Sequence, residues 1–167
     1  MIKGDIEKLK AKKRFFLKNK KIKEIKKELG DYADIIPKKS QVELVEFEDL
    51  PDILLINNEP LFMKSGDSFI PTLKAVLTMD INEKYATVDM GAINFVIKGA
   101  DIMSPGIVDA DKSIQEGDII VINEEGHKKP LAIGKSMISG EEMIENNKGK
   151  AIKNLHYIGD PIWELDI

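Results

Sequence analysis

The stretch that most constrains the fold is residues 88–107, VDMGAINFVIKGADIMSPGI, in which three glycines and one proline interrupt an otherwise apolar run. Without these breaks the run would continue as one helix or one strand. We predict that Gly99 ends a helix in the left-handed conformation, and that Pro105 and Gly106 form a type II turn after a strand. The segment therefore either turns corners inside a small domain or leaves its backbone bare for a ligand.

The ligand hypothesis depends on the chemistry beside Gly99. Glycine has no Cβ atom, so the N–H groups of residues 98–101 can approach a base or a phosphate closely. Lys98 places a positive charge next to them. Together the helix end, the lysine and the bare loop predict one wall of a binding pocket.

Composition excludes several classes of protein. The chain has 167 residues, 43% of them apolar, which suffices for one ordinary domain or two small ones. No apolar run approaches the roughly 18 residues that a membrane-spanning helix needs. Cysteine is absent, which excludes disulfides, thiolate zinc sites and cysteine nucleophiles, and His127 and His156 stand apart without a metal-ligand spacing. We expect a soluble, cytoplasmic protein with no metal and no cofactor.

Charge is strongly segregated along the chain. Residues 1–29 carry 12 Lys and Arg against 4 Asp and Glu, a net charge of +8, whereas the remainder carries 13 against 25, a net charge of −12. A basic segment on an acidic body favours a polyanionic partner, although a solvated lysine face would give the same count.

The basic segment predicts a strand at 14–17 and then a helix with Asn19 as its N-cap and Gly30 at its end. One face of this helix is apolar, formed by Ile22, Ile25 and Leu29. The other face carries Lys20, Lys21, Lys23, Lys26 and Lys27. The lysines that we expect to contact RNA phosphates are Lys20, Lys23 and Lys27. A further helical turn is suggested upstream by Ile2, Ile6 and Leu9.

Short β-type runs follow, at 42–47, 52–56 and 60–64. Asn57 and Asn58 tolerate the left-handed conformation and join the last two runs in a tight hairpin. Pro71 is expected in the first turn of a short helix over 69–79. A domain boundary near 79–84 then separates an α+β first half from a mostly β second half.

The second half predicts six short strands, at 85–89, 100–104, 118–123, 131–137, 151–158 and 162–165. Two helices are expected, at 91–98 and 139–147, and a hairpin turn at 124–127. Ser139 and Glu142 have the spacing of a capping box at the start of the second helix. Short strands with two helices predict a compact, barrel-like β domain.

Three segments resemble the PUA domain, the RNA-binding module shared by pseudouridine synthases and archaeosine transglycosylases. They are the opening motif at 88–107, IQEGDIIVI at 114–122 and LAIGKSMIS at 131–139. The agreement is closer with one family, the malignant T-cell-amplified-sequence proteins, which are translation factors of eukaryotes with archaeal relatives. Their order of motifs is found here at PKK 37–39, LF 61–62, PTL 71–73, residues 88–107 and NLHYIGDPIWEL 154–165.

This resemblance implies a pre-PUA α+β domain at 1–82 and a PUA domain at 83–167, folded as a mixed β pseudo-barrel. It also implies binding to the small ribosomal subunit, contact with a tRNA acceptor end, and a partner protein with an initiation-factor-like domain. The task would be start-site tRNA placement or ribosome recycling. Carried over to this chain, the RNA-facing residues are Lys98, Gly99, Ala100, Asp101, Met103, Pro105 and Gly106.

Other motifs do not support catalysis. The AIGKS run at 132–136 has Lys129 where a phosphate loop needs glycine, and it continues a strand pattern. Paired acids fit an acidic loop or the first turn of a helix, namely Asp109 with Asp111 and Glu141 with Glu142. Trp163 is expected in the core. We therefore predict a protein that binds RNA and catalyses nothing by itself.

Two rival functions fit the same sequence. An accessory RNA-targeting subunit of a separate RNA-modifying enzyme would carry the same motif, and ribosome co-sedimentation would distinguish it. A protein-interaction adaptor would use the glycines only to turn corners, and it would lack salt-dependent RNA binding.

Overall fold

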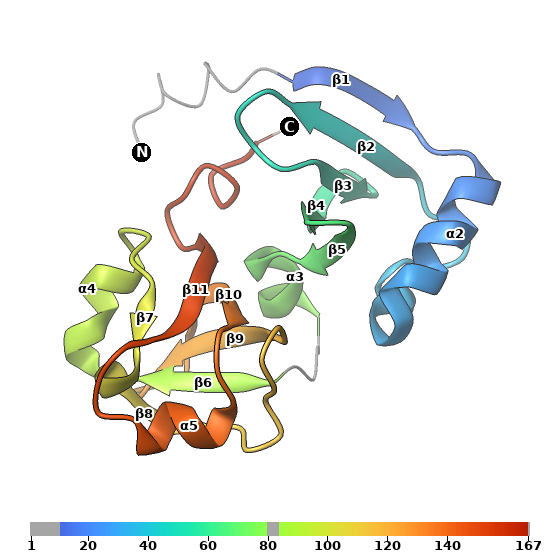
Figure 1. The fold of residues 1–167 in the computed structure, drawn as a ribbon. Coiled ribbons are helices and arrows are strands. Elements are labelled where there is room, and N and C mark those ends of the chain that lie inside the picture. Colours follow the sequence, from blue (N-terminus) through green and yellow to red (C-terminus); the bar gives the residue numbers. More distant parts are fainter. Residues whose placement is uncertain (1–10, 80–83, 167) are drawn as a thin grey trace. The chain divides into compact units, whose positions relative to one another are not determined.

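The chain divides into two compact units, one of residues 1–81 with 164–167 and the other of residues 82–163. The computed structural model describes residues 11–79 and 84–166 (Figure 1). Within these ranges no helix is long and apolar enough to cross a membrane. The expected upstream helical turn lies outside the described residues, at Ile2, Ile6 and Leu9.

The first unit contains a five-stranded antiparallel meander in the order β1-β2-β3-β4-β5. Its strands are β1 Ala11–Phe16, β2 Val42–Phe47, β3 Ile53–Ile56, β4 Glu59–Ser65 and β5 Ser68–Pro71. Asn57 and Asn58 have φ angles of 50° and 70°, so the left-handed hairpin turn expected from these residues is confirmed. Strands β2 to β5 are joined by short loops, which favour antiparallel pairing of neighbours, whereas β1 and β2 pair although residues 17–41 lie between them.

Helix α2, Asn19–Leu29, and the 3-10 helix Gly30–Ile35 cover this sheet's core residues. The predicted stripe is confirmed, since Ile25 and Leu29 are buried and Ile22 is partly buried. Gly30 has a φ of 55° where α2 ends. The predicted N-cap is wrong: Lys18 occupies the cap in an extended conformation without a side-chain bond, and Asn19 is already helical.

Helix α3, Leu73–Thr78, begins four residues later than the expected range of 69–79. Pro71 is the last residue of β5, an edge strand, where its missing N–H leaves no ladder bond unmade. Thr72 caps the helix instead, because its Oγ1 accepts a 3.3 Å bond from the N–H of Ala75 and donates to the carbonyl of Pro60.

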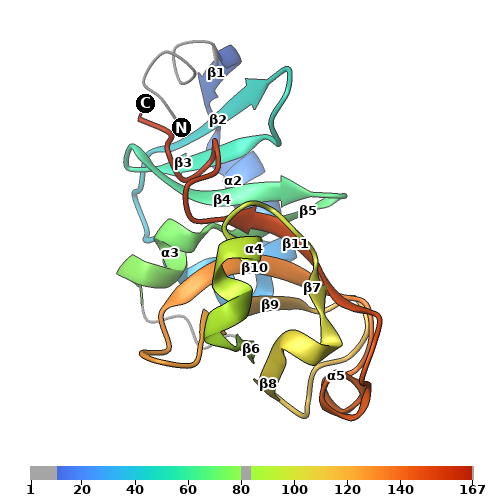
Figure 2. The ribbon, with the colours of Figure 1, turned by 90° about the vertical axis from the view of Figure 1, so that its left-hand side faces the viewer.

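The second unit is a nearly closed β pseudo-barrel with strand order β7-β11-β10-β9-β6-β8 (Figures 1 and 2). Its strands are β6 Tyr85–Val88, β7 Ile102–Met103, β8 Ile107–Ala110, β9 Ile119–Glu124, β10 Pro130–Ser136 and β11 Lys150–Tyr157. Strands β6 and β9 pair in parallel, and the other described pairs are antiparallel. The α+β fold class with a C-terminal β pseudo-barrel is confirmed.

Short helices complete the second unit. The expected helix over 91–98 is a 3-10 turn, Met90–Ala92, followed by the four-residue α4, Ile93–Val96. Helix α5, Gly140–Glu145, starts with the predicted capping box between Ser139 and Glu142. The core between these elements is apolar and includes Val88, Val96, Ile102, Ile120, Ile122, Met143 and Ile152.

Four expectations for the C-terminal half of the chain are wrong. Ser104–Gly106 forms a 3-10 turn rather than a type II turn, because Gly106 does not adopt a positive φ. Residues 162–165 are not a strand, since the carboxylate of Asp160 accepts the N–H of Trp163 at 2.7 Å and holds the backbone in a turn. Trp163 is only partly buried. Asp109 lies on the unpredicted strand β8 and not in an acidic loop.

Candidate nucleic-acid interface

Residues 89–106 fold around a groove of about 560 Å³, which we call the α4–β7 groove. One wall is the 3-10 turn Met90–Ala92 with α4, and the other is β7 with the 3-10 turn Ser104–Gly106 (Figure 2). The two walls are joined at their base, because the N–H of Asp89 donates to the carbonyl of Gly106 at 2.9 Å. The groove is therefore built from one continuous stretch of sequence.

Asn154, on strand β11, holds the α4–β7 connection from behind. Its side-chain amide donates to the carbonyls of Val96 and Ala100 at 3.0 and 3.1 Å, and its N–H donates to Asp101 at 3.0 Å. The other oxygen of Asp101 lies 3.4 Å from Nζ of Lys150. Asp101 lines the groove, yet both of its oxygens already have partners within the protein.

Gly99 ends α4 as predicted, with a φ of 92°. The N–H of Gly99 donates to the carbonyl of Val96 and that of Ala100 to the carbonyl of Phe95, which is the Schellman pattern. A Cβ atom at Gly99 would lie only 3.0 to 3.2 Å from the ring of Tyr157. Its bare backbone faces that ring, and Gly99 is not among the residues that line the groove.

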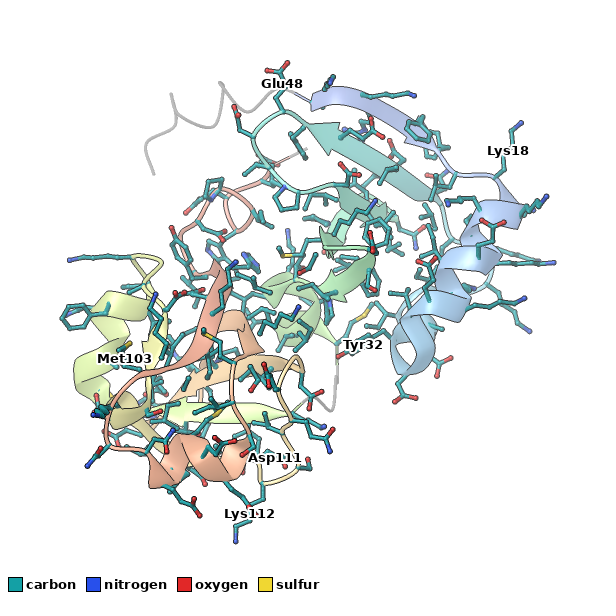
Figure 3. The ribbon with its side chains drawn as sticks, viewed as in Figure 1. Lys18, Tyr32, Glu48, Met103, Asp111 and Lys112 are labelled. Carbon is teal, nitrogen blue, oxygen red and sulfur yellow. The ribbon has the colours of Figure 1, made fainter. Side chains whose placement is uncertain are left out.

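Two large apolar side chains stand exposed in the groove, one on each wall. Phe95 on α4 is 68% exposed, and Met103 on β7, labelled in Figure 3, is 45% exposed. Exposed apolar surface of this kind inside a concavity marks a binding site more often than a fold requirement. Phe95 was not among the site residues predicted from the sequence. Its signal is an aromatic residue that lies off the helix face of Ile93 and Val96, which pack on the core.

Of the RNA-facing residues expected from the sequence, five line the groove: Ala100, Asp101, Met103, Pro105 and Gly106. Lys98 is exposed but does not line it. The described lining contains Asp89 and Asp101 and no lysine or arginine. The groove therefore presents shape and apolar surface rather than positive charge.

The lysines expected to contact phosphates lie on α2, in the first unit. Lys20, Lys23 and Lys27 are all exposed. Lys23 lines a smaller concavity on that unit, whereas Lys20 and Lys27 do not. The predicted site residues therefore do not form one site: five line the groove, three lysines lie on α2, and Lys98 and Gly99 belong to neither group.

The carboxyl groups with lowered pKa values lie outside the groove. Hydrogen bonds, chiefly from Ser113, Lys84 and the N–H of Lys129, hold the pKa values of three carboxyl groups below their usual range: Asp111, Asp118 and Glu124. None of the three lines the groove. Across the described residues, no three His, Asp or Glu side chains gather as metal ligands would.

Known proteins resemble this chain over nearly its whole length. The PUA domain model matches residues 84–158, and a model called domain of unknown function (DUF1947) matches residues 13–79. An uncharacterized protein of Methanocaldococcus jannaschii is 48% identical, over 94% of this chain and 99% of that relative. Translation machinery-associated protein 20 of Saccharomyces cerevisiae is 40% identical, over 90% of this chain and 87% of its own length.

More distant relatives and a solved structure agree. Malignant T-cell-amplified sequence 1-B of Xenopus laevis is 33% identical, over 89% of each chain. The crystal structure of a hypothetical protein of Pyrococcus horikoshii is 37% identical, with a TM-score of 0.79, and the match covers 91% of this chain and 98% of that one. Both units therefore match related proteins together.

Proposed function

The chain belongs to the family of translation machinery-associated protein 20 and the malignant T-cell-amplified sequence proteins, and from that premise we propose an RNA-binding factor of the translation machinery. PUA domains bind RNA, and the matched PUA region includes the whole α4–β7 groove. We propose that residues 1–82 are the pre-PUA domain and residues 83–167 the PUA domain. The protein acts by binding, without a covalent step.

The finer proposal concerns the RNA and the partners. The α4–β7 groove takes the unpaired end of a tRNA acceptor arm, while the protein as a whole sits on the small ribosomal subunit. A partner protein with an initiation-factor-like domain acts with it, in start-site tRNA placement or in ribosome recycling. Cytoplasmic location follows from that role.

The observation that carries the proposal is the pair of exposed apolar side chains in the groove. Proteins that recognise single-stranded RNA stack unpaired bases on aromatic side chains, and stacking needs an exposed ring beside a concavity. Phe95 offers the ring, and Met103 offers a polarizable thioether on the opposite wall. Ala100, Pro105 and Gly106 present little side chain, so a flat base can enter between the walls.

The test replaces Phe95 by Ala in the full chain and measures binding of a labelled tRNA acceptor stem with its single-stranded 3′ end. We expect affinity to fall about fivefold or more, since stacking contributes about 1–3 kcal/mol per base. Ile144→Ala is the matched control, because Ile144 is also an exposed apolar residue, 50% exposed, on helix α5 outside the groove. Equal effects of the two variants would contradict the groove proposal.

A second experiment addresses the RNA in the cell. Crosslinking followed by sequencing should recover small-subunit ribosomal RNA together with tRNA. Recovery of a set of modification targets in their place would support an accessory subunit of an RNA-modifying enzyme and would overturn the translation role.

A further inference from the structure

A second concave site lies on the first unit, between α2 and the turn at 37–40, with a volume of about 230 Å³. We call it the lysine pocket. Ile22 and Ile36 contribute an apolar surface to it, and Ile36 is only 3% exposed, so this surface belongs to the core of the unit. The lysines that line the pocket are Lys23, Lys26, Lys38 and Lys39.

Both elements that carry these lysines are fixed by the fold. Helix α2 is anchored by Ile25 and Leu29, which are buried in the first unit's core. The turn is closed twice at the carbonyl of Pro37, by the N–H of Ser40 at 3.3 Å and by its hydroxyl at 2.7 Å. The backbone positions of the four lysines are therefore set by the fold before any ligand arrives.

Among the described residues, no acidic side chain lies within ion-pair distance of these lysines. Elsewhere in the unit Lys21 lies 3.7 Å from Glu24 and Arg14 lies 2.6 Å from Glu43. None of the four pocket lysines forms an ion pair in the described part of the chain. Four uncompensated ammonium groups around one concavity repel each other, and a bound anion would relieve that repulsion.

Lys39 gives an independent indication. Its φ angle is 64°, in the left-handed region that non-glycine residues seldom adopt. Glycine would hold the same turn with less strain. A strained backbone at a side chain that faces a pocket is typical of a functional position, and the side chain here is a cation.

From these observations we infer that the lysine pocket binds a phosphodiester group of RNA, as a second RNA contact separate from the α4–β7 groove. This inference rests on the proposed RNA-binding function. The pocket is small and suits one backbone step rather than a folded ligand. Its cations are ammonium groups, which bind phosphate oxygens as compact point charges.

The test uses the full chain and a fluorescently labelled U12 RNA, with the dissociation constant measured over a series of KCl concentrations. Lys26→Gln with Lys38→Gln removes two pocket charges and keeps the helix propensity at position 26. Lys64→Gln with Lys74→Gln removes two charges from exposed sites on the same unit outside the pocket. We expect the pocket pair to lower the salt slope by about 0.7, since the pocket takes one phosphate group and each phosphate contact on a single strand contributes about 0.7. The control pair should change the slope by less than half as much.

Equal slopes for the two pairs would overturn the inference, because net charge alone would then explain the binding. Phe95→Ala distinguishes this failure from that of the proposed function. If Phe95→Ala weakens binding and the pocket pair matches its control, the groove function stands without the pocket. Hexaglutamate provides the rival ligand class: tighter binding than U12, lost in the pocket pair, would make the site one for an acidic peptide and would also overturn the inference.

Lys39→Gly tests the same site without depending on charge counts on the helix. Glycine relieves the left-handed strain, so the melting temperature should rise, while the affinity for U12 should fall about threefold or more. A rise in melting temperature with unchanged affinity would show that Lys39 contributes nothing to binding and would overturn its place in the pocket.

Discussion

The α4–β7 groove and the lysine pocket differ in how their polar groups are used. In the groove, Asp101 and the carbonyls of Val96 and Ala100 are bonded to Asn154 and Lys150, so the walls have few polar groups left for a ligand. In the pocket, the lysines have no acidic partner among the described residues. The groove therefore offers shape and apolar surface, whereas the pocket offers positive charges that no described acidic side chain pairs with.

Gly99 and Lys39, which both have a left-handed backbone conformation, also differ between the two sites. Gly99 in the groove unit has a φ of 92°, and Lys39 at the pocket has a φ of 64°. Glycine is required at the first position by Tyr157, whereas at the second a lysine is tolerated although glycine would be less strained. Folding explains the glycine in the second unit, whereas the proposed RNA contact would account for a lysine at the pocket. Binding to RNA should accordingly split into a salt-insensitive part and a salt-sensitive part.

The largest effect is expected from Gly99→Ala, which should destabilise the second unit by about 2–3 kcal/mol. The left-handed conformation costs about 1 kcal/mol for a residue with a Cβ atom, and displacing the Tyr157 ring adds about 1–2 kcal/mol. Gly117→Ala is the matched control, because Gly117 has the same φ of 92° and nothing within 4 Å of its Cβ position. Denaturant unfolding followed in both variants measures the difference.

RNA affinity of the folded Gly99→Ala protein should remain close to that of the original chain, because Gly99 does not line the groove. Lys39→Gly should show the opposite pattern, with a higher melting temperature and a lower RNA affinity. An intact fold with strongly weakened binding would mean that RNA approaches the backbone of Gly99, and the contrast between the two residues would fail.

Local signals predicted much of this fold. Gly30 ends a helix, Asn57 and Asn58 turn a hairpin, and Ser139 with Glu142 starts a helix, all by interactions within a few residues. Signals that depend on distant partners were misread. Pro71 ends a strand because β5 lies at a sheet edge, which the neighbouring residues do not reveal.

The candidate site divides in the same way. The resemblance to the PUA family predicted seven RNA-facing residues between 98 and 106. Five of them line the α4–β7 groove, whereas Lys98 and Gly99 do not. The sequence did not reveal that Asn154, more than 50 residues away, would fix the connection so that Phe95 stays exposed. Nor did it reveal that Lys38 and Lys39 would join two lysines of α2 around one pocket, because only the fold brings those segments together.

A smaller effect is expected from Asp101→Asn, which would leave an unpaired lysine charge beside the groove, as in the lysine pocket. Asparagine keeps an oxygen for the N–H of Asn154 and removes the charge that pairs with Lys150 at 3.4 Å. Lys150 is then free to attract phosphates beside the groove. We expect RNA affinity to rise about two- to threefold and the salt slope to steepen by about 0.7.

The control for that variant is Glu145→Gln, which removes an equal charge from an exposed site on α5. A fall in affinity for Asp101→Asn would contradict the expectation. It would mean that the Asp101 carboxylate itself contacts RNA, in spite of its two partners within the protein.

The smallest effect is expected at low pH. It concerns the stability of the second unit and not RNA binding. The N–H of Lys129, followed by those of His127 and Gly126, holds the pKa of Glu124 below its usual range. A carboxyl group with a lowered pKa in the folded state stabilises the fold above its unfolded pKa of about 4.3. That stability is lost as the pH falls through the lower folded value.

At pH 7, Glu124→Gln should therefore melt at a lower temperature than the original chain. The difference between the two melting temperatures should shrink as the pH falls from about 5 to about 3. Hydrogen exchange should show the loosening in residues 84–163, because the three carboxyl groups with lowered pKa values all lie there, namely Asp111, Asp118 and Glu124. Glu145→Gln, at an exposed site where the side chain accepts no described hydrogen bond, should show neither change. If the difference in melting temperature stays constant with pH, the variant is destabilised by the different shape of glutamine, and ionisation of Glu124 contributes nothing to stability. Acid could then loosen the second unit only through Asp111 and Asp118, whose pKa values are also lowered.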